Sequence, residues 1–435
     1  MLSAAWWAPS QNLFAGDWPQ WRGPSLNGSS QDTDLPTTLS ISGNLRWSVP
    51  LPGEGASTPV IVGNHVFLTS TDSSKNALIA LCIDAANGEI LWEKNRPTSS
   101  TYSIPYSCIA APSAVADQNQ ALFAFGTGLL LACDHAGDIL WERDLEREYG
   151  PLSLEHYYSA SPLLYKNRIY LAVLRNDKIS FFQKELGYNR TENLASFILC
   201  LDWRNGENIW RQVRKSEADG VENRESYATP IVMESDSGAL VFSIGANYLT
   251  GHDWETGAEK LRMNYKLNDA VHRRRVVPTP VLTDQWIIAV KPRYGALFAL
   301  DRDSLGELPY SSIQWEHAQY TPDTPSPLYY RDGIYILNDQ KGILTRLNTE
   351  TGAAAWSGKV GNNLFHASPT GGDGKIYCIN LRGEVTVLEA GPAFKILSKT
   401  KLGGQPCMSS IAIANQCLYI RTSDTLYCFC DVSEK

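Results

Sequence analysis

The sequence predicts an all-β protein made of eight similar four-stranded sheets. Three observations predict this fold. A turn that begins with Asp and contains Gly recurs along the 435-residue chain, a short segment with Ser, Thr or Pro opens each copy, and a large apolar residue, usually Trp, follows each turn. Repeats of this length are typical of architectures in which like units stack on one another. We therefore expect one large repeat-built domain.

Each copy opens with a small residue or proline ahead of a short apolar run. The openings are STPVIV at 57, APSAV at 111, SPLLY at 161, TPIVM at 229, TPVLT at 279, SPLYY at 326, SPTGG at 368 and the weaker SSIAI at 409. A turn such as GNH or RDG follows, and then a run such as VFLTS or IYLAV. Turn residues between runs rich in β-branched and aromatic residues predict a β-hairpin. The first two strands of each copy are therefore expected to be antiparallel neighbours.

The recurrent turn joins a third strand to a fourth. In the first copy, the run ALIALCID ends at Asp84, whose carboxylate can accept backbone N–H groups, while Gly88 can take a positive φ. The run EILWEKN after the turn predicts the fourth strand, so four antiparallel strands form the unit. The equivalent residues of later copies are Asp134, Asp202, Asp253, Asp301, Asn348 and the degenerate Glu389.

The large apolar residue lies on the predicted fourth strand. It is Trp92, Trp141, Trp210, Trp315 and Trp356 in five copies, and Leu261 and Leu397 in two. On an outermost strand such a residue needs a neighbouring sheet to cover it, so the sheets must stack face to face. Four-stranded units that bury both faces against like units close radially into a β-propeller. Separate β-sandwich domains, the alternative, would not repeat one Asp-Gly-Trp phrase along the chain.

The two ends of the chain are expected to share one blade. The eighth copy ends at TLYCFCDVSEK, after its third strand, and NLRWSVPL at 44–51 resembles EILWEKN without a repeat of its own. We therefore predict an eight-bladed β-propeller over residues 44–431, with four-stranded antiparallel blades and the last blade closed by the N-terminal strand that carries Trp47. Residues 17–43 are expected to form an N-terminal arm.

The composition narrows the function and the compartment. A net charge of -8 argues against binding to nucleic acid or to an anionic membrane, since both need a basic field. No apolar run approaches the length of a transmembrane segment. Residues 1–16 lack a basic start but are apolar, with small residues near Ala15, and could be the remnant of an export signal. The chain has nine cysteines, so at least one is unpaired unless it forms a disulfide with another chain. Cys82, Cys133 and Cys200, close to the turn Asp residues, are expected to be core fillers.

Two features resemble a known family. The phrases ALIALCIDAANGEILW and ILTRLNTETGAAAW resemble the repeat of pyrroloquinoline-quinone-like (PQQ-like) β-propellers, and DWPQWRGP at 17–24 is similar to the start of exported bacterial members. The resemblance implies the propeller fold over nearly the whole chain. It leaves function open, because the family contains both quinoprotein dehydrogenases and non-catalytic scaffolds, including an outer-membrane assembly lipoprotein.

The dehydrogenase branch of this family implies specific residues. Its members resemble one another in a vicinal Cys-Cys disulfide beneath the quinone and in a Glu, an Asn and a catalytic Asp around a calcium ion. This sequence has no Cys-Cys dipeptide; its closest pair is Cys428 and Cys430, which flank one Phe and should point the same way on a strand. No residue matches the calcium ligands by motif. We therefore expect no catalytic residues, no metal site and no cofactor, with PQQ and calcium only under the dehydrogenase alternative.

A binding site is expected on one face of the disc. The loops that lead into the first strand of each blade and the loops between second and third strands lie on the same side, which we call the loop face, and such loops collect binding residues. The candidate ligand-binding residues are Arg224, Tyr227, Tyr248, Arg274, Arg275, Lys291, Arg293, Tyr294, His156, Tyr158, Asn338 and His366. Guanidinium groups bind carboxylate or phosphate, and aromatic rings stack on planar or sugar-like groups.

The sequence leaves alternatives open for this face. The arginines could instead pair with Glu222, Glu225 and Asp269 nearby, and the insertion at 175–196 could be a partner-docking loop, a lid or a loop without function. The function that we expect is a non-catalytic binding or assembly platform, exported to the periplasm or secreted, that takes a protein partner or a small anionic ligand at the loop face. The alternative is a PQQ-dependent dehydrogenase of alcohols or sugars.

Overall fold

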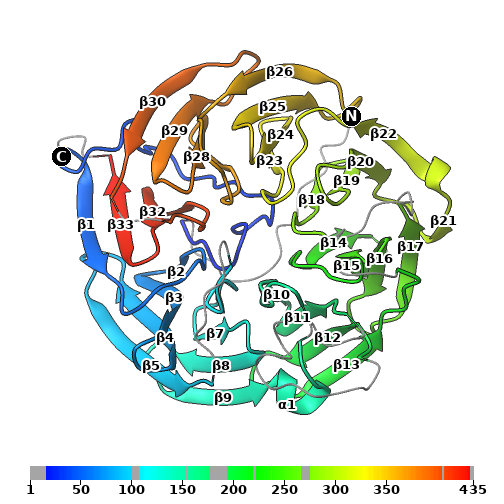
Figure 1. Ribbon diagram of the computed structural model, residues 1–435, viewed down its shortest axis with the longest axis horizontal. Coiled ribbons are helices and arrows are strands. Elements are labelled where there is room, and N and C mark those ends of the chain that lie inside the picture. Colours follow the sequence, from blue (N-terminus) through cyan, green and yellow to red (C-terminus); the bar gives the residue numbers. More distant parts are fainter. Residues whose placement is uncertain are drawn as a thin grey trace.

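Eight sheets stand radially around a central axis in the part of the chain that the structure describes (Figure 1). The structure is a computed structural model and describes residues 16–99, 107–152, 154–176, 194–218, 222–236, 238–265, 275–403 and 406–431. Each sheet is one blade, with its first strand at the axis and its fourth at the rim. The predicted eight-bladed propeller is confirmed.

The first four blades follow one another along the chain. Blade 1 contains β2 (Val60–Val62), β3 (His65–Asp72), β4 (Ala77–Asp84) and β5 (Ile90–Pro97), and blade 2 contains β6 (Val115–Ala116), β7 (Gln120–Ala124), β8 (Leu129–Asp134) and β9 (Ile139–Asp144). Blade 3 contains β10 (Leu163–Tyr165), β11 (Arg168–Val173), β12 (Phe197–Asp202) and β13 (Asn208–Val213), and blade 4 contains β14 (Ile231–Ser235), β15 (Gly238–Gly245), β16 (Tyr248–Asp253) and β17 (Glu259–Asn264).

The remaining blades repeat the pattern. Blade 5 contains β18 (Val281–Leu282), β19 (Trp286–Val290), β20 (Leu297–Asp301) and β22 (Ile313–His317), and blade 6 contains β23 (Leu328–Tyr330), β24 (Gly333–Asn338), β25 (Ile343–Asn348) and β26 (Ala354–Lys359). Blade 7 contains β27 (Thr370–Gly372), β28 (Lys375–Ile379), β29 (Glu384–Glu389) and β30 (Ile396–Lys401), and blade 8 contains β31 (Ala412–Ala414), β32 (Cys417–Arg421), β33 (Thr425–Cys430) and β1 (Leu45–Pro50).

One blade departs from four strands. The short strand β21 (Gly306–Leu308) lies in the insertion ahead of Trp315 and pairs in parallel with β17, as a fifth strand at the rim of blade 4. The helical segments that the structure describes are α1 (Leu145–Tyr149) and the 3-10 turn η1 (Tyr310–Ser312). With five and three residues, neither is long enough to cross a bilayer.

The N-terminal strand closes the ring as predicted. Figure 1 shows β1, in blue, alongside the red β33, and the two strands pair in antiparallel fashion with Trp47 opposite Cys428. A disulfide between Cys417 and Cys430 joins β32 to β33 in the same blade. Cys82, Cys133 and Cys200 are buried in the strands, as expected of core fillers.

Four of the rim tryptophans, namely Trp47, Trp92, Trp141 and Trp210, bind the Asp–Gly turn of the next blade. The indole Nε1 donates a hydrogen bond to the carbonyl oxygen of the residue after the turn's Asp: Trp47 to Ala85 at 3.0 Å, Trp92 to His135 at 2.9 Å, Trp141 to Trp203 at 3.1 Å and Trp210 to Trp254 at 3.2 Å. The turn glycine lies under the ring, where a Cβ on Gly88 would come within 2.6 Å of Trp47. The repeated Asp, Gly and Trp therefore form one contact between consecutive blades.

The N-terminal arm crosses the face opposite the loop face. Trp18 pairs with Ile61 of blade 1, Gln20 pairs with Val115 of blade 2, and Ser29 pairs with Gly371 of blade 7. The buried Arg22 donates to the carbonyl oxygens of Pro327 and Pro369, at 2.6 and 3.0 Å. The arm therefore connects blades that are distant in sequence and covers one end of the central axis (Figure 1).

Candidate functional site

A ring of hydroxyl groups surrounds the axis of the propeller. Its members are the Ser or Thr residues of the opening segments: Thr58, Ser113, Ser161, Thr229, Thr279, Ser326, Ser368 and Ser410. The backbone N–H of each member donates to the side-chain oxygen of the next, at 2.9 to 3.3 Å, and Ser410 donates to Thr58 to complete the circle. The opening segments thus tie the blades together at the centre, as the tryptophans do at the rim.

A cavity of about 160 Å³ lies within this ring. Its lining includes every ring residue except Thr279, together with Tyr227, His366 and, from the arm, Trp21. The described residues that line it include no Asp or Glu. Calcium is bound through several oxygen ligands, among which carboxylates are prominent. This donor set therefore does not fit the calcium-bound quinone that the dehydrogenase alternative requires.

Four charged side chains from three blades meet on the loop face. Arg275, ahead of β18, donates to both carboxylate oxygens of Asp323, ahead of β23, at 3.0 and 3.3 Å. Arg293, between β19 and β20, donates to Glu222, ahead of β14, at 2.9 Å and lies 3.9 Å from Asp323. We call Glu222, Arg275, Arg293 and Asp323 the loop-face cluster. It holds two cations and two anions, so its formal charge is balanced.

The partners of the arginines differ in part from those that sequence proximity suggested. Glu222 does pair with Arg293. Arg275 instead pairs with Asp323, 48 residues along the chain, because the loops of blades 5 and 6 meet at the axis. Arg274 and Asp269 lie outside the described residues, as does most of the insertion at 175–196. The exposed part of the cluster is Arg293, whose side chain is 37% accessible.

Glu225, which was considered as a partner for the arginines, instead binds Tyr227 and the loop of blade 3. It is buried and accepts hydrogen bonds from the Tyr227 hydroxyl at 2.6 Å, from the Glu155 N–H at 3.0 Å and from the Asn176 side chain. Burial raises the pKa of Glu225 to about 8, and the hydrogen bonds from Tyr227 and Glu155 oppose that rise. Because the hydroxyl of Tyr227 also accepts the N–H of His156 at 3.0 Å, Glu225 ties the loop of blade 3 to blade 4.

Three other predicted residues lie around the cluster. The Tyr294 hydroxyl donates to Asp339 at 2.9 Å, and the other Asp339 oxygen accepts the N–H of Asp323 at 2.9 Å. Burial lowers the pKa of His366 to about 4, while the charges of Asp323 and Arg275 act on it in opposite directions. Burial also lowers the pKa of His156, and Arg275 adds to that effect. Tyr227, Tyr294, His156 and His366 therefore surround the paired arginines.

The remaining predicted residues make contacts elsewhere in their own blades. Lys291 binds Glu316 and Tyr310 near the rim, Tyr248 stacks under Arg262 of β17 at 4.5 Å, and Arg224 donates to the Ala218 carbonyl oxygen at 2.7 Å. Asn338 donates to the Thr321 carbonyl oxygen at 2.8 Å, and Tyr158 is fully buried. The predicted set thus divides into residues that lie in or around the loop-face cluster and residues that make contacts elsewhere in the loops and blades.

The fold recurs in solved structures with low sequence identity. The crystal structure of BamB from Moraxella catarrhalis superposes with a TM-score of 0.60 at 16% identity, covering 88% of this chain and 99% of that one. A europium-containing methanol dehydrogenase superposes with a TM-score of 0.72 at 10% identity, over 96% and 98% of the two chains. A quinohemoprotein alcohol dehydrogenase from Comamonas testosteroni gives 0.69 at 11% identity, over 97% and 81%. These likenesses show the propeller fold alone.

Sequence comparison is more specific about the family. No curated protein matches the chain significantly. The profile of the family described as outer membrane protein assembly factor BamB matches residues 31–181 and 195–432, which include every blade. The chain therefore belongs to this BamB-like family of PQQ-type β-propellers.

Proposed function

We propose that this protein is a non-catalytic platform that binds a protein partner through its loop face, outside the cytoplasm. The observation that carries the proposal is the loop-face cluster, which joins the loops of blades 4, 5 and 6 and leaves Arg293 accessible. Loops held by a rigid scaffold are frequent binding surfaces. The description of the family to which the chain belongs names an assembly factor, and this favours a protein as the binding partner.

The internal pairing of the cluster favours a protein over a small anion. A free anion would have to displace the carboxylate of Asp323 from Arg275 or that of Glu222 from Arg293. Both carboxylates are nearly buried. A protein surface can instead add contacts to the accessible side of Arg293 and to the surrounding aromatic residues without breaking these pairs. A partner with an acidic patch and an exposed apolar or aromatic residue fits this surface.

Two features support a location outside the cytoplasm. The family description refers to assembly of outer-membrane proteins. The disulfide between Cys417 and Cys430 is of a kind that persists in oxidising compartments and is rare in the cytosol.

The proposal is tested by affinity capture from a solubilised bacterial envelope with two charge-reversed variants. Arg293→Glu alters the loop face, whereas Arg204→Glu, on the exposed β12–β13 turn of the opposite face, is the matched control. We expect Arg293→Glu to reduce the yield of a captured protein by about 10-fold or more, because like charges across an interface are costly. Equal yields from the two variants would reject the loop face as the binding surface.

The dehydrogenase alternative has its own test. Protein incubated with PQQ and calcium is examined for quinone absorbance and for dye-linked oxidation of alcohols and sugars. The cavity lining described above leads us to expect neither tight uptake nor turnover, and tight uptake with turnover would replace the platform by an enzyme.

A further inference from the structure

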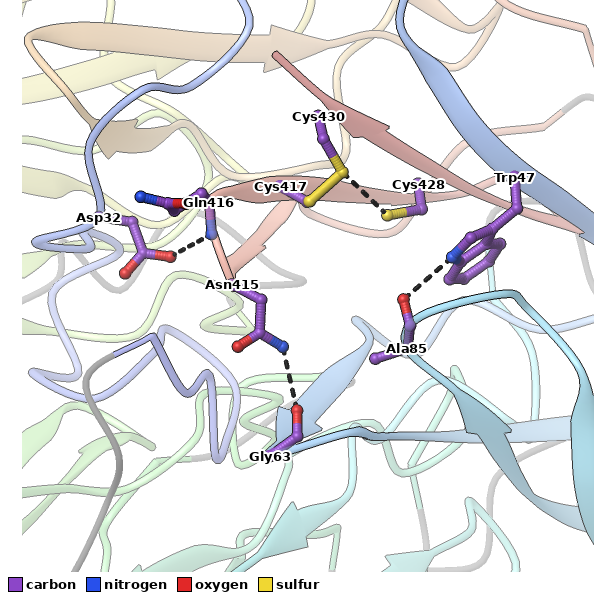
Figure 2. The surroundings of a disulfide bond; sticks show 9 residues. All are labelled: Asp32, Trp47, Gly63, Ala85, Asn415, Gln416, Cys417, Cys428 and Cys430. Carbon is purple, nitrogen blue, oxygen red and sulfur yellow. Dashed lines mark hydrogen bonds between the residues drawn. A yellow bond between two sulfur atoms is a disulfide. The ribbon is translucent and has the colours of Figure 1, made fainter. Parts of the chain in front are cut away.

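Three cysteine sulfurs lie together at the point where the ring closes (Figure 2). Cys417 and Cys430 form the disulfide, and the Cys428 sulfur lies 3.8 Å from that of Cys430. All three Sγ atoms lie within 4.8 Å of one another. Cys428 and Cys430 are two residues apart on β33, so they share a face, and Cys417 lies opposite Cys430 on β32. The register of two strands thus brings three sulfurs to one place.

The surroundings place this group between blade 8 and blade 1. Trp47 of β1 lies opposite Cys428, and its indole reaches Ala85 of blade 1 (Figure 2). The cysteine group therefore lies on the face of blade 8 that is turned toward blade 1. Cys417 and Cys428 are buried, whereas Cys430 is partly exposed. An external thiol can approach through Cys430.

We propose that the reduced Cys417–Cys428–Cys430 group is a binding site for one soft monovalent cation, Cu(I). Thiolate sulfur is the ligand type that selects Cu(I), whereas calcium and magnesium prefer oxygen. A trigonal ion with metal–sulfur bonds of about 2.3 Å holds its sulfurs about 4 Å apart, close to the separation of Cys428 and Cys430. Structural zinc is four-coordinate, whereas among the described residues this group consists of three cysteines, with no His or carboxylate within the 4.8 Å that its sulfurs span.

Metal binding and disulfide formation exclude each other in this site. An external dithiol reduces the Cys417–Cys430 disulfide by two electrons, giving two thiols and leaving the reductant as its own disulfide. Cu(I) then replaces three thiol protons, which are released to water.

The experiment is an anaerobic titration of the full chain, reduced with a phosphine, with Cu(I) against bicinchoninate as a competing chelator. We expect one Cu(I) per chain, an ultraviolet thiolate-to-copper band and a sulfur-only shell in X-ray absorption. Cys428→Ser and Cys430→Ser should each weaken binding by more than about 100-fold, since loss of an outer-shell partner alone costs about 10- to 100-fold. Protein that retains the Cys417–Cys430 disulfide should not bind this one Cu(I) per chain.

The matched control is Cys378→Ser, which changes a buried cysteine of blade 7. It should bind Cu(I) like the parent chain. Unchanged binding in Cys428→Ser, an equal loss in Cys378→Ser, uptake by the disulfide form or displacement of Cu(I) by equimolar Zn²⁺ would each overturn the assignment. If Cys428→Ser fails to fold by circular dichroism, Cys430→Ser at the partly exposed position decides the outcome.

Discussion

The indole Nε1 of Trp47 donates a hydrogen bond to the carbonyl oxygen of Ala85 at 3.0 Å, and this contact joins the first described strand to the first complete blade. The same indole covers Gly88. Trp47 therefore belongs to blade 8 by strand pairing and to blade 1 by packing. The contact closes the ring in the way that Trp92, Trp141 and Trp210 join consecutive blades.

Replacing Trp47 by Ala should destabilise the whole propeller. The side chain is 8% exposed, and removal of such a buried aromatic typically costs about 3–5 kcal/mol of unfolding free energy. Urea unfolding followed by circular dichroism measures the change. Leu305→Ala, at a side chain that is 58% exposed, is the control and should change the unfolding free energy by less than about 0.5 kcal/mol. Similar costs for both variants would show that the seam does not depend on Trp47.

Substitution of Gly88 separates backbone strain from contact with the indole. Gly88→Ala should cost more than Gly63→Ala, because both glycines have positive φ, at 79° and 57°, but only the Cβ at position 88 would meet Trp47. The strain of a left-handed alanine alone is about 1–2 kcal/mol. Unfolding free energies of the two variants give the comparison. Equal costs would contradict a close packing of turn and indole.

The pair of Arg275 and Asp323 should show strong coupling. The two side chains are 12% and 8% exposed, so Asp323→Leu leaves a nearly buried guanidinium without its carboxylate, at a cost of about 3–5 kcal/mol. The double change Arg275→Met with Asp323→Leu should cost less, since it removes both charges. A double-mutant cycle in urea measures this difference. Additive effects of the single changes would show that the pair does not hold the loops together.

Stability should fall in mild acid through His252. This imidazole is fully buried, and burial lowers its pKa to about 4 from the ordinary 6.5. The imidazole therefore binds a proton more tightly in the unfolded chain than in the folded one. Its contribution to the free energy of unfolding is complete above pH 6.5 and is lost as the pH falls toward 4. We expect the parent chain to lose about 2 kcal/mol more between pH 7 and pH 5 than His252→Asn does. Equal losses would place the acid sensitivity elsewhere.

The architecture could be predicted because the same sequence pattern recurs in successive copies along the chain. The recurrent Asp–Gly turn and the rim Trp form one contact. The sequence of each copy therefore predicts both its strand order and a neighbouring blade that covers the Trp. The role of the opening Ser and Thr residues was not predicted, because the hydrogen bond from Ser410 to Thr58 exists only after the ring has closed. The fifth strand β21 was also missed, since its three residues carry no strand pattern that stands out from the insertion.

The candidate site could be predicted only in part. Topology placed Arg275 and Arg293 on one face, and the structure brings them together. Glu222, Glu225 and Asp269 were considered as partners for the arginines, but the partner of Arg275 is Asp323 of the next blade, and Glu225 binds Tyr227 instead. Cys428 and Cys430 were expected to share a face, but the third sulfur is supplied by the register between β32 and β33, which sequence spacing does not determine.

The most direct test of the platform is site-specific photo-crosslinking in a bacterial envelope. The photoreactive residue p-benzoylphenylalanine is placed at Asn362, an exposed loop-face position, or at Leu305, away from that face. The proposed function predicts a discrete crosslinked protein from position 362 that disappears in the Arg293→Glu background, and none from position 305. Crosslinks of equal intensity from both positions, or from position 362 irrespective of Arg293, would contradict it.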